Sequence, residues 1–248
     1  MRRSPRRSGS LFLLLSVAVL FEGFDTKLAS LVLPLLEGEF NVGPEALFST
    51  LSAVNSGMVL GVLLIPLADR WGRRPVFLVS FAGYSLFTLL TAFVTSVAAF
   101  AVAQFLAKMF LVSQLAIAYV ILSEEASPER RGRLNGLMGA FASVGAALPA
   151  WFLAPVESTG FGWRGLFLLG SIPLILLPLY FVGLKETRMF EESKGAEREA
   201  LLSRARGLLG PGAYAGRELA HGHALLLLGP ALGLPHAAGS SRQPVREH

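Results

Sequence analysis

Apolar residues occur in six long runs along the chain, and short segments between the runs hold most of the charge. The hydrocarbon core of a bilayer is about 30 Å thick, so a helix that crosses it needs roughly 20 apolar residues. Inside lipid, helices satisfy their own backbone polar groups. The pattern therefore predicts an all-α integral membrane bundle of six helices within residues 11–192, after a short segment of residues 1–10. The predicted spans cover residues 11–36, 46–68, 76–95, 98–122, 134–156 and 166–184.

The basic residues predict which side of the membrane each loop faces. Four arginines lie among the first ten residues, three in the loop after the second run and three in the loop after the fourth. Lys185 and Arg188 follow the sixth run, whereas the loops on the other side hold Arg164 alone. Loops rich in Lys and Arg stay in the cytoplasm. We therefore expect a protein of the plasma or inner membrane with both termini in the cytoplasm.

Composition narrows the functional classes. The chain is 53% hydrophobic and 16% charged, against about 25% charged residues in soluble domains. Its net charge is +5, but the basic residues gather in short loops, so we expect no nucleic-acid partner. Cysteine is absent and the four histidines all follow residue 220. The six runs thus lack the side chains of a metal site or a nucleophile–base pair, and we expect neither an enzyme nor a cofactor.

The end of the chain differs in composition from the six runs. From Ser203 onward it is rich in Gly, Arg, Ala, Pro and Leu and contains no Phe, Ile or Thr. Its one apolar stretch is too short to span a membrane. We expect residues 193–248 to form a disordered cytoplasmic tail. Because the shift is abrupt, translation out of frame would also produce it, and the chain would then be a truncated half.

The first run contains three ionisable residues, Glu22, Asp25 and Lys27. Each costs about 2.5–3.5 kcal/mol inside a membrane helix, so each needs a reason to be there. Asp25 lies about 21 Å along the helix from Leu11, close to the middle of the membrane, and Glu22 shares its face. Either Asp25 or Glu22 binds a proton or coupling ion, or Asp25 belongs to a structural ion pair, for which Lys108 is a partner.

The fourth run holds Gln104 and Lys108 on one face, since they are four residues apart. A buried ammonium group there would attract an anionic substrate or neutralise a carboxylate of the first helix. The alternative is that Lys108 extends to the membrane interface. Asn55 in the second run is a weaker candidate for substrate contact, because a lone amide also serves to join two helices.

Two loops resemble motifs of the major facilitator superfamily. The stretch Asp69-Arg-Trp-Gly-Arg-Arg74, which follows the second run, resembles the loop motif between helices two and three of these transporters. The stretch Glu124-Glu-Ala-Ser-Pro-Glu-Arg-Arg-Gly132 resembles the motif that joins helices four and five. The resemblance implies a conformational latch of charged groups on the cytoplasmic side, formed by Asp69, Gly72, Arg73, Arg74, Glu125 and Arg131.

Within the superfamily, Phe21-Glu-Gly-Phe-Asp-Thr26 resembles the first helix of the metabolite and aromatic-acid proton symporters, and Gly162-Trp-Arg164 resembles the start of the sixth helix in those symporters and in sugar porters. Trp71-Gly-Arg-Arg74 also corresponds in position to Trp163-Arg-Gly165. The resemblance implies twelve helices in two halves, each built from two inverted three-helix repeats.

The resemblance further implies alternating-access transport of a small organic solute, as proton-coupled symport. We expect this chain, as the first half, to be inactive unless it pairs with a second half or a second copy. The alternative is a six-helix membrane protein that assembles with partners and transports nothing.

Overall fold

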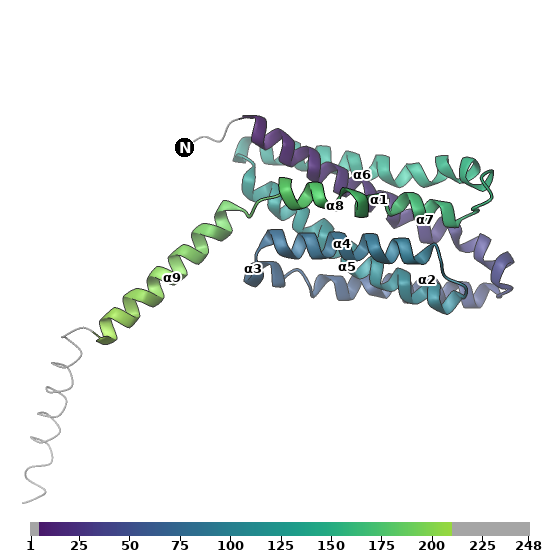
Figure 1. Ribbon diagram of the computed structural model, residues 1–248, viewed down its shortest axis with the longest axis horizontal. Helices are drawn as coiled ribbons and strands as arrows, with labels where there is room; N and C mark the ends of the chain where they lie inside the picture. Colours follow the sequence, from purple (N-terminus) through teal and green to yellow (C-terminus); the bar gives the residue numbers. More distant parts are fainter. Residues whose placement is uncertain (1–4, 210–248) are drawn as a thin grey trace, which may run out of the picture. The chain divides into compact units, whose positions relative to one another are not determined.

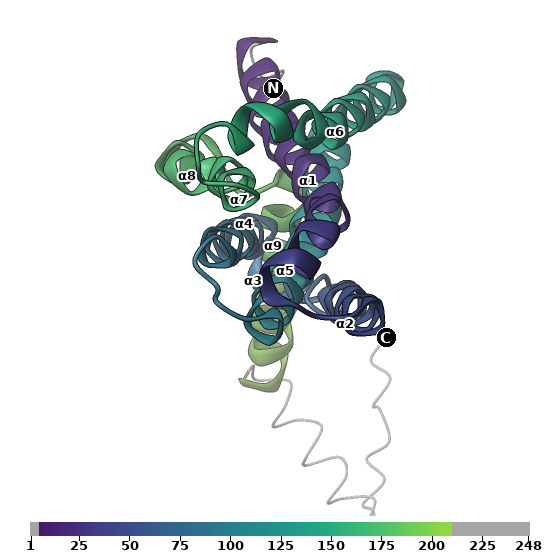
Figure 2. The same ribbon diagram turned by 90° about the vertical axis from the view of Figure 1, so that its right-hand side faces the viewer.

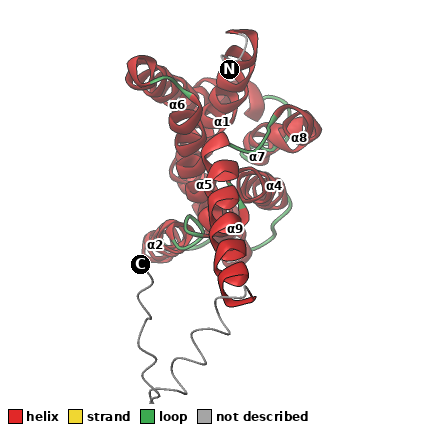
Figure 3. Ribbon diagram, turned by 90° about the vertical axis from the view of Figure 1, so that its left-hand side faces the viewer, coloured by secondary structure: helices red, strands yellow, loops and turns green. Residues whose placement is uncertain are grey.

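The computed structural model describes residues 5–209, and its regular elements there are all helices (Figures 1 and 3). The predicted all-α class is therefore confirmed. The chain divides into two units, Met1–Glu192 and Ser193–His248, and the bundle belongs to the first of them. In chain order the helices are α1 (Pro5–Phe40), α2 (Pro44–Val62), α3 (Leu67–Trp71), α4 (Arg73–Thr91), α5 (Val97–Glu125), α6 (Pro128–Glu157), α7 (Arg164–Gly170), α8 (Ile172–Gly183) and α9 (Arg188–Leu209).

Five helical segments are long and apolar enough to cross a membrane. They are Pro44–Trp71, Arg73–Thr91, Val97–Glu125, Pro128–Glu157 and Arg164–Gly183, and each contains most or all of a predicted span. The first predicted span falls in α1, which begins at Pro5 and has 36 residues. At about 1.5 Å per residue that helix is roughly 54 Å long, which exceeds the thickness of the hydrocarbon core. Among the described residues the structure thus has five candidate spans, and α1 is long enough to be the predicted sixth.

Two of the spans consist of two helices each. Between α2 and α3, successive backbone N–H groups donate to the carbonyl three residues back, as in the bond from Ile65 to Val62. Pro66 has no N–H for a continuous helix at this point. Between α7 and α8, Ser171 marks the break and Pro173 lies in the first turn of the new helix. Proline thus accounts for both interruptions.

Figure 2 looks along the helices and places α1 and α5 centrally, with α2 and α6 on one side and α4, α7 and α8 on the other. The most extensive packing joins α1 to α6 and α5 to both α2 and α4. In the inverted-repeat description, α1, α2–α3 and α4 form the first repeat, and α5, α6 and α7–α8 the second. The α1–α6 and α5–α2 pairs are then equivalent, because each joins the first helix of one repeat to the second helix of the other.

Glycines allow the close approach in both of these helix pairs. A Cβ atom added at Gly23 or Gly145 would overlap a backbone carbonyl across the α1–α6 contact. A Cβ atom at Gly57 or Gly61 would overlap a carbonyl of α5 in the same way. Small residues let membrane helices approach this closely, and van der Waals packing between backbones then stabilises the pair. The contact at Gly23 also fixes α1 two residues before Asp25.

The residues after the bundle begin as a helix. α9 runs from Arg188 to Leu209 and therefore extends into the segment expected to be disordered. Glu, Arg, Lys, Ala and Leu are frequent between these bounds, and all of them favour helix. The helical part of the chain is thus longer than composition predicted. Residues 210–248, which form the rest of the predicted tail, lie outside the described residues, as do residues 1–4.

Candidate functional site

Asp25 of α1 and Lys108 of α5 form an ion pair inside the bundle. Their side chains are 0% and 1% exposed, and Lys108 Nζ lies 3.3 Å from Asp25 Oδ2. The same ammonium group donates a hydrogen bond of 2.7 Å to the backbone carbonyl of Asp25. The sequence analysis left open whether Lys108 extends to an interface or neutralises a carboxylate of the first helix, and the structure shows the ion pair.

The other oxygen of Asp25 also has a partner. Thr88 of α4 donates from Oγ1 to Asp25 Oδ1 over 2.9 Å. One helical turn further along α4, Thr91 Oγ1 accepts a hydrogen bond of 3.0 Å from Nε2 of the buried Gln104. The Gln104 Oε1 atom is buried and has no hydrogen-bond partner among the described residues. Three helices thus place Asp25, Lys108, Thr88, Thr91 and Gln104 in one polar cluster within an apolar bundle.

The predicted site residues Glu22 and Asn55 do not take part in the hydrogen bonds of this cluster. Glu22 is partly buried on α1 and accepts a hydrogen bond of 2.9 Å from Thr26. Asn55 is exposed on α2, and Lys27 is exposed on α1. Thr88 and Thr91 were not predicted, because a threonine in an apolar run carries no sign of a partner on another helix.

Burial makes each charge of the pair depend on the other. Removing a charge from water is costly, and opposite charge with good hydrogen bonds offsets that cost. Loss of either partner would leave the other charge buried without a counterion.

The arginine loop forms a second charged site at the end of the bundle where α3 meets α4. Gly72 separates the two helices with φ 111° and ψ 153°, a conformation that is essentially restricted to glycine. The backbone N–H groups of Arg73 and Arg74 donate to the carboxylate of Glu186, with a shortest distance of 2.9 Å. A Cβ atom at Gly72 would overlap this carboxylate. Glu186 thus satisfies orphan N–H groups at the start of α4.

The Arg73 side chain joins three segments at this end. Its guanidinium lies 2.9 Å from the Asp69 carboxylate and 3.1 Å from that of Glu124, and Nη1 donates to the Ala68 carbonyl. It also lies over the ring of Phe190, 5.2 Å from the centroid. A network of this kind stabilises through several partners rather than through one.

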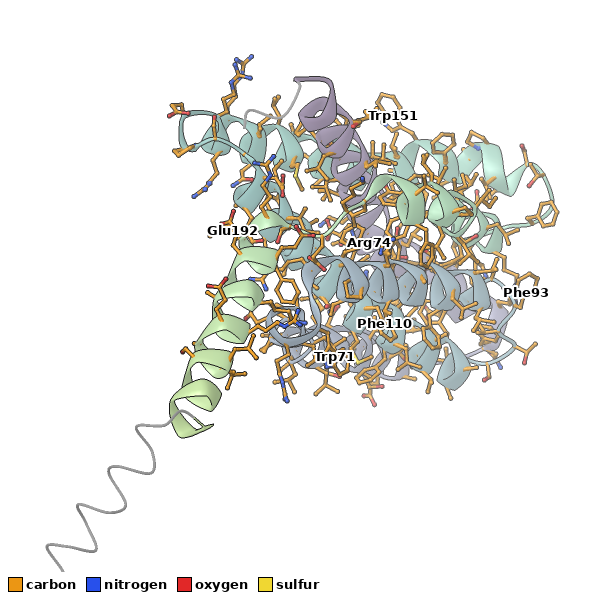
Figure 4. The ribbon with its side chains drawn as sticks, turned by 60° about the vertical axis from the view of Figure 1, so that its left-hand side comes forward. Trp71, Arg74, Phe93, Phe110, Trp151 and Glu192 are labelled. Atoms are coloured by element: carbon orange, nitrogen blue, oxygen red, sulfur yellow. The ribbon has the colours of Figure 1, made fainter. Side chains whose placement is uncertain are left out.

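Arg74 turns toward the end of α8. Its Nε donates to the Leu184 carbonyl over 2.7 Å, and its Nη2 donates to the Phe181 carbonyl over 2.8 Å. Figure 4 shows Phe93 at one end of the bundle, with Trp71 and Arg74 both well away from that end. Arg74 thus connects the first repeat to the last transmembrane helix of the second.

Four predicted latch residues, Asp69, Gly72, Arg73 and Arg74, therefore lie together. Glu125 instead accepts a hydrogen bond of 3.1 Å from the Arg188 backbone. Arg131 is exposed on α6. The carboxylates that meet the loop are Glu124 and Glu186, which were not among the predicted latch residues. Glu124 lies next to the predicted Glu125, and Glu186 lies next to Lys185. The sequence alone does not indicate that these two carboxylates, rather than Glu125, contact the loop.

A family model and the related sequences place the chain in the same protein family. The model of the Major Facilitator Superfamily matches residues 15–237. A putative niacin/nicotinamide transporter of Bacillus subtilis is 33% identical over 184 residues, which is 72% of this chain and 45% of that protein. A 4-hydroxybenzoate transporter of Acinetobacter baylyi is 32% identical over 179 residues, or 71% of this chain and 39% of that protein. The chain spans less than half the length of these relatives.

Solved structures share the fold. The inward-open xylose transporter XylE from E. coli has a TM-score of 0.67 and 18% identity, covering 86% of this chain and 56% of that chain. The proton:xylose symporter XylE bound to 6-bromo-6-deoxy-D-glucose has a TM-score of 0.69 and 20% identity, covering 92% and 57%. The six helices thus match about half of each of these chains.

Proposed function

Because the chain belongs to the Major Facilitator Superfamily, we propose that it acts as the amino-terminal half of a transporter that carries a small organic solute by alternating access. The chain is a multi-pass membrane protein, and its relatives are named as transporters. The observation that carries the proposal is the ion pair of Asp25 and Lys108, buried between α1 and α5. Ionisable groups at this depth mark ion and substrate pathways in membrane proteins.

The substrate class follows from the charge of this pair. We infer that the solute is an organic anion whose carboxylate approaches Lys108 while Asp25 carries a proton. Relatives of this chain are named for 4-hydroxybenzoate and gallate, both of them aromatic carboxylates. Uptake of an anion together with a proton is electrically balanced, which favours proton-coupled symport.

Uptake by proteoliposomes tests the half-transporter interpretation. The 248-residue chain alone should take up no labelled 4-hydroxybenzoate, because the second half of the central cavity is absent. Co-expression with the part of the Acinetobacter relative that this chain does not match should restore proton-driven uptake. Robust uptake by the chain alone would contradict this interpretation.

Substitutions in the same complemented protein test the site. Lys108→Met should abolish binding of 4-hydroxybenzoate, and Asp25→Asn should remove the dependence of uptake on a proton gradient. Lys27→Met is the matched control, since Lys27 is exposed on the same helix as Asp25. If neither site variant changes solute binding, the alternative of a non-transporting assembly partner is favoured.

We further propose that the arginine loop faces the cytoplasm and contributes to a latch between the two halves. The contacts of Arg73 and Arg74 all lie within this half, so they hold its own helices together. Asp69, however, is 73% exposed and retains acceptor capacity for a second half. Because the chain has no cysteine, Arg70→Cys and Phe161→Cys can be labelled singly in intact cells. Only the Phe161→Cys protein should react with an impermeant reagent added outside.

A further inference from the structure

A second charged cluster lies at the end of the bundle opposite the arginine loop. Arg164, the first residue of α7, forms an ion pair with Glu39 near the end of α1. Its Nη2 also donates to the Val94 carbonyl over 2.9 Å, just beyond α4. The other oxygen of Glu39 accepts a hydrogen bond from Trp163 Nε1. The cluster therefore joins the ends of α1, α4 and α7.

Aromatic rings form the base of this cluster. The Arg164 guanidinium lies over the Trp163 ring, 4.4 Å from the centroid. Trp163 is 4% exposed and meets the rings of Phe40, Phe100 and Phe167 edge-on, at centroid distances of 6.5, 6.0 and 5.7 Å. Edge-on ring pairs and a guanidinium over an indole are both favourable. The ion pair is thus anchored on a packed core rather than held by two flexible side chains alone.

The two clusters have the same plan. In each, an arginine at the start of the third helix of one repeat pairs with a carboxylate at the end of the first helix of the other repeat. Arg73 pairs with Glu124 of α5, and Arg164 pairs with Glu39 of α1. In each, an arginine also donates to a carbonyl just past the third helix of the other repeat, and a guanidinium covers an aromatic ring. The inverted repeat therefore reproduces the contacts of one end at the other.

We propose that Glu39, Trp163 and Arg164 form a second clamp, the Glu39 clamp, which fixes the two three-helix repeats to each other at the end opposite the arginine loop. With a clamp at both ends, the half moves as one rigid body, and Arg164 is a positioning residue that holds α1 in register with α4. This inference rests on the geometry of the half itself and stands whether or not the proposed solute is correct.

The first test is a double-mutant cycle on the full 248-residue chain in detergent. Glu39→Gln removes the carboxylate charge, and Arg164→Met removes the guanidinium. Each should lower the Tm by roughly 1–4 °C, since each removes one partner of a partly exposed ion pair. The double variant should lose about as much as either single variant, because the second change removes an interaction that is already lost. Glu45→Gln is the control, since Glu45 is exposed on α2 near the same end.

The second test measures positioning rather than stability. Spin labels can be placed in this cysteine-free chain at Glu37 and Phe93, which are exposed beside the clamp on α1 and after α4. A second pair at Trp71 and Val182 reports on the arginine-loop end. Arg164→Met should broaden the distance distribution of the first pair and leave the second unchanged. General destabilisation would broaden both pairs.

The results of the two tests distinguish the Glu39 clamp from a general loss of stability. Non-additive losses of Tm together with broadening at one end support the Glu39 clamp. Additive losses, no loss in either single variant, or equal broadening at both ends would each overturn it. A charge-reversed protein, Glu39→Arg with Arg164→Glu, adds a further check if it folds, because it should regain part of the lost Tm. None of these readouts depends on solute uptake, so failure of the proposed transport function would leave the test intact.

Discussion

The Asp25–Lys108 pair and the Arg73 network both join α5 to another helix through opposite charges, but their surroundings differ. The first pair is almost completely buried, and each charged group has one oppositely charged partner at close range. Arg73 is 15% exposed and shares its guanidinium among two carboxylates and a carbonyl, while Asp69 is largely open to solvent. The buried pair therefore depends on both members, whereas the network distributes its interactions.

This difference in burial predicts how strongly each site depends on any one of its charged partners. A buried charge that loses its partner pays the full cost of desolvation, so removing either member of the pair should have a large effect. Exposed charges are screened and solvated, so loss of one partner changes little. The pair is suited to coupling, and the network to holding helices in place. Three substitutions test this contrast and a fourth tests the close packing beside it, and the first should have the largest effect.

Lys108→Met should be the most destabilising, because it leaves the Asp25 carboxylate buried without a countercharge. We expect the free energy of unfolding to fall by roughly 3–5 kcal/mol. Urea or SDS titration of the purified chain in mixed micelles, followed by circular dichroism, measures this quantity. Asp25→Asn combined with Lys108→Met should recover much of the loss. A loss no greater than that of the exposed control Lys27→Met would show that the pair is not energetically important.

Gly145→Ala should come next, because the new Cβ would overlap a carbonyl of α1 and push that helix away from α6. Overpacking of this kind costs about 1–3 kcal/mol. Gly136→Ala on the same helix is the matched control, since its Cβ would meet no atom within 4 Å. Alanine favours helix over glycine, so the control should be neutral or slightly stabilising. Equal losses in the two variants would contradict the close packing of α1 on α6.

Arg73→Gln should have a moderate effect, although the residue has more polar partners than Lys108. We expect a loss of about 1–2 kcal/mol, because Glu124 is partly buried and retains some access to water. Arg70→Gln, at an exposed position in the same loop, should change the free energy of unfolding by less than about 0.5 kcal/mol. A larger loss from Arg73→Gln than from Lys108→Met would reverse the contrast between the two sites.

Asp69→Asn should have the smallest effect on the isolated half, within about 0.5 kcal/mol, because the carboxylate is 73% exposed. The same change in the protein complemented with a second half should slow uptake, since the latch between halves would lose a charge. Thermal unfolding and uptake measured on the same variant separate the two effects. A large loss of stability in the isolated half would place the role of Asp69 within this half instead.

The sequence was sufficient for most of the spans. The length of each apolar run limits where a helix can cross, and counting residues from its end predicts that Asp25 and Lys108 lie near mid-membrane. The sequence could not determine how each helix is rotated about its own axis. Neighbouring residues on a helix point about 100° apart, so whether Glu124 or Glu125 meets Arg73 depends on how α5 is turned.

The same limit explains the position of Asn55 and the role of Glu186. Asn55 shares the exposed side of α2 with Ser52 and Ser56, and a lone amide does not show in advance whether a neighbouring helix covers it. Glu186 reaches the start of α4 from more than 110 residues away along the chain. Such a contact follows from the packing of the repeats and from the backbone of Gly72, neither of which a local motif specifies.

The contact between Gly72 and Glu186 has a consequence for the substitutions that position 72 tolerates. A side chain at position 72 would displace the carboxylate that binds the first N–H groups of α4. Shortening that acid to Asp would remove the overlap, but any side chain at φ 111° remains strained. Gly72→Ala should therefore stay harmful even beside Glu186→Asp, and a suppressor screen that begins from a Gly72 variant should return mainly reversions to glycine.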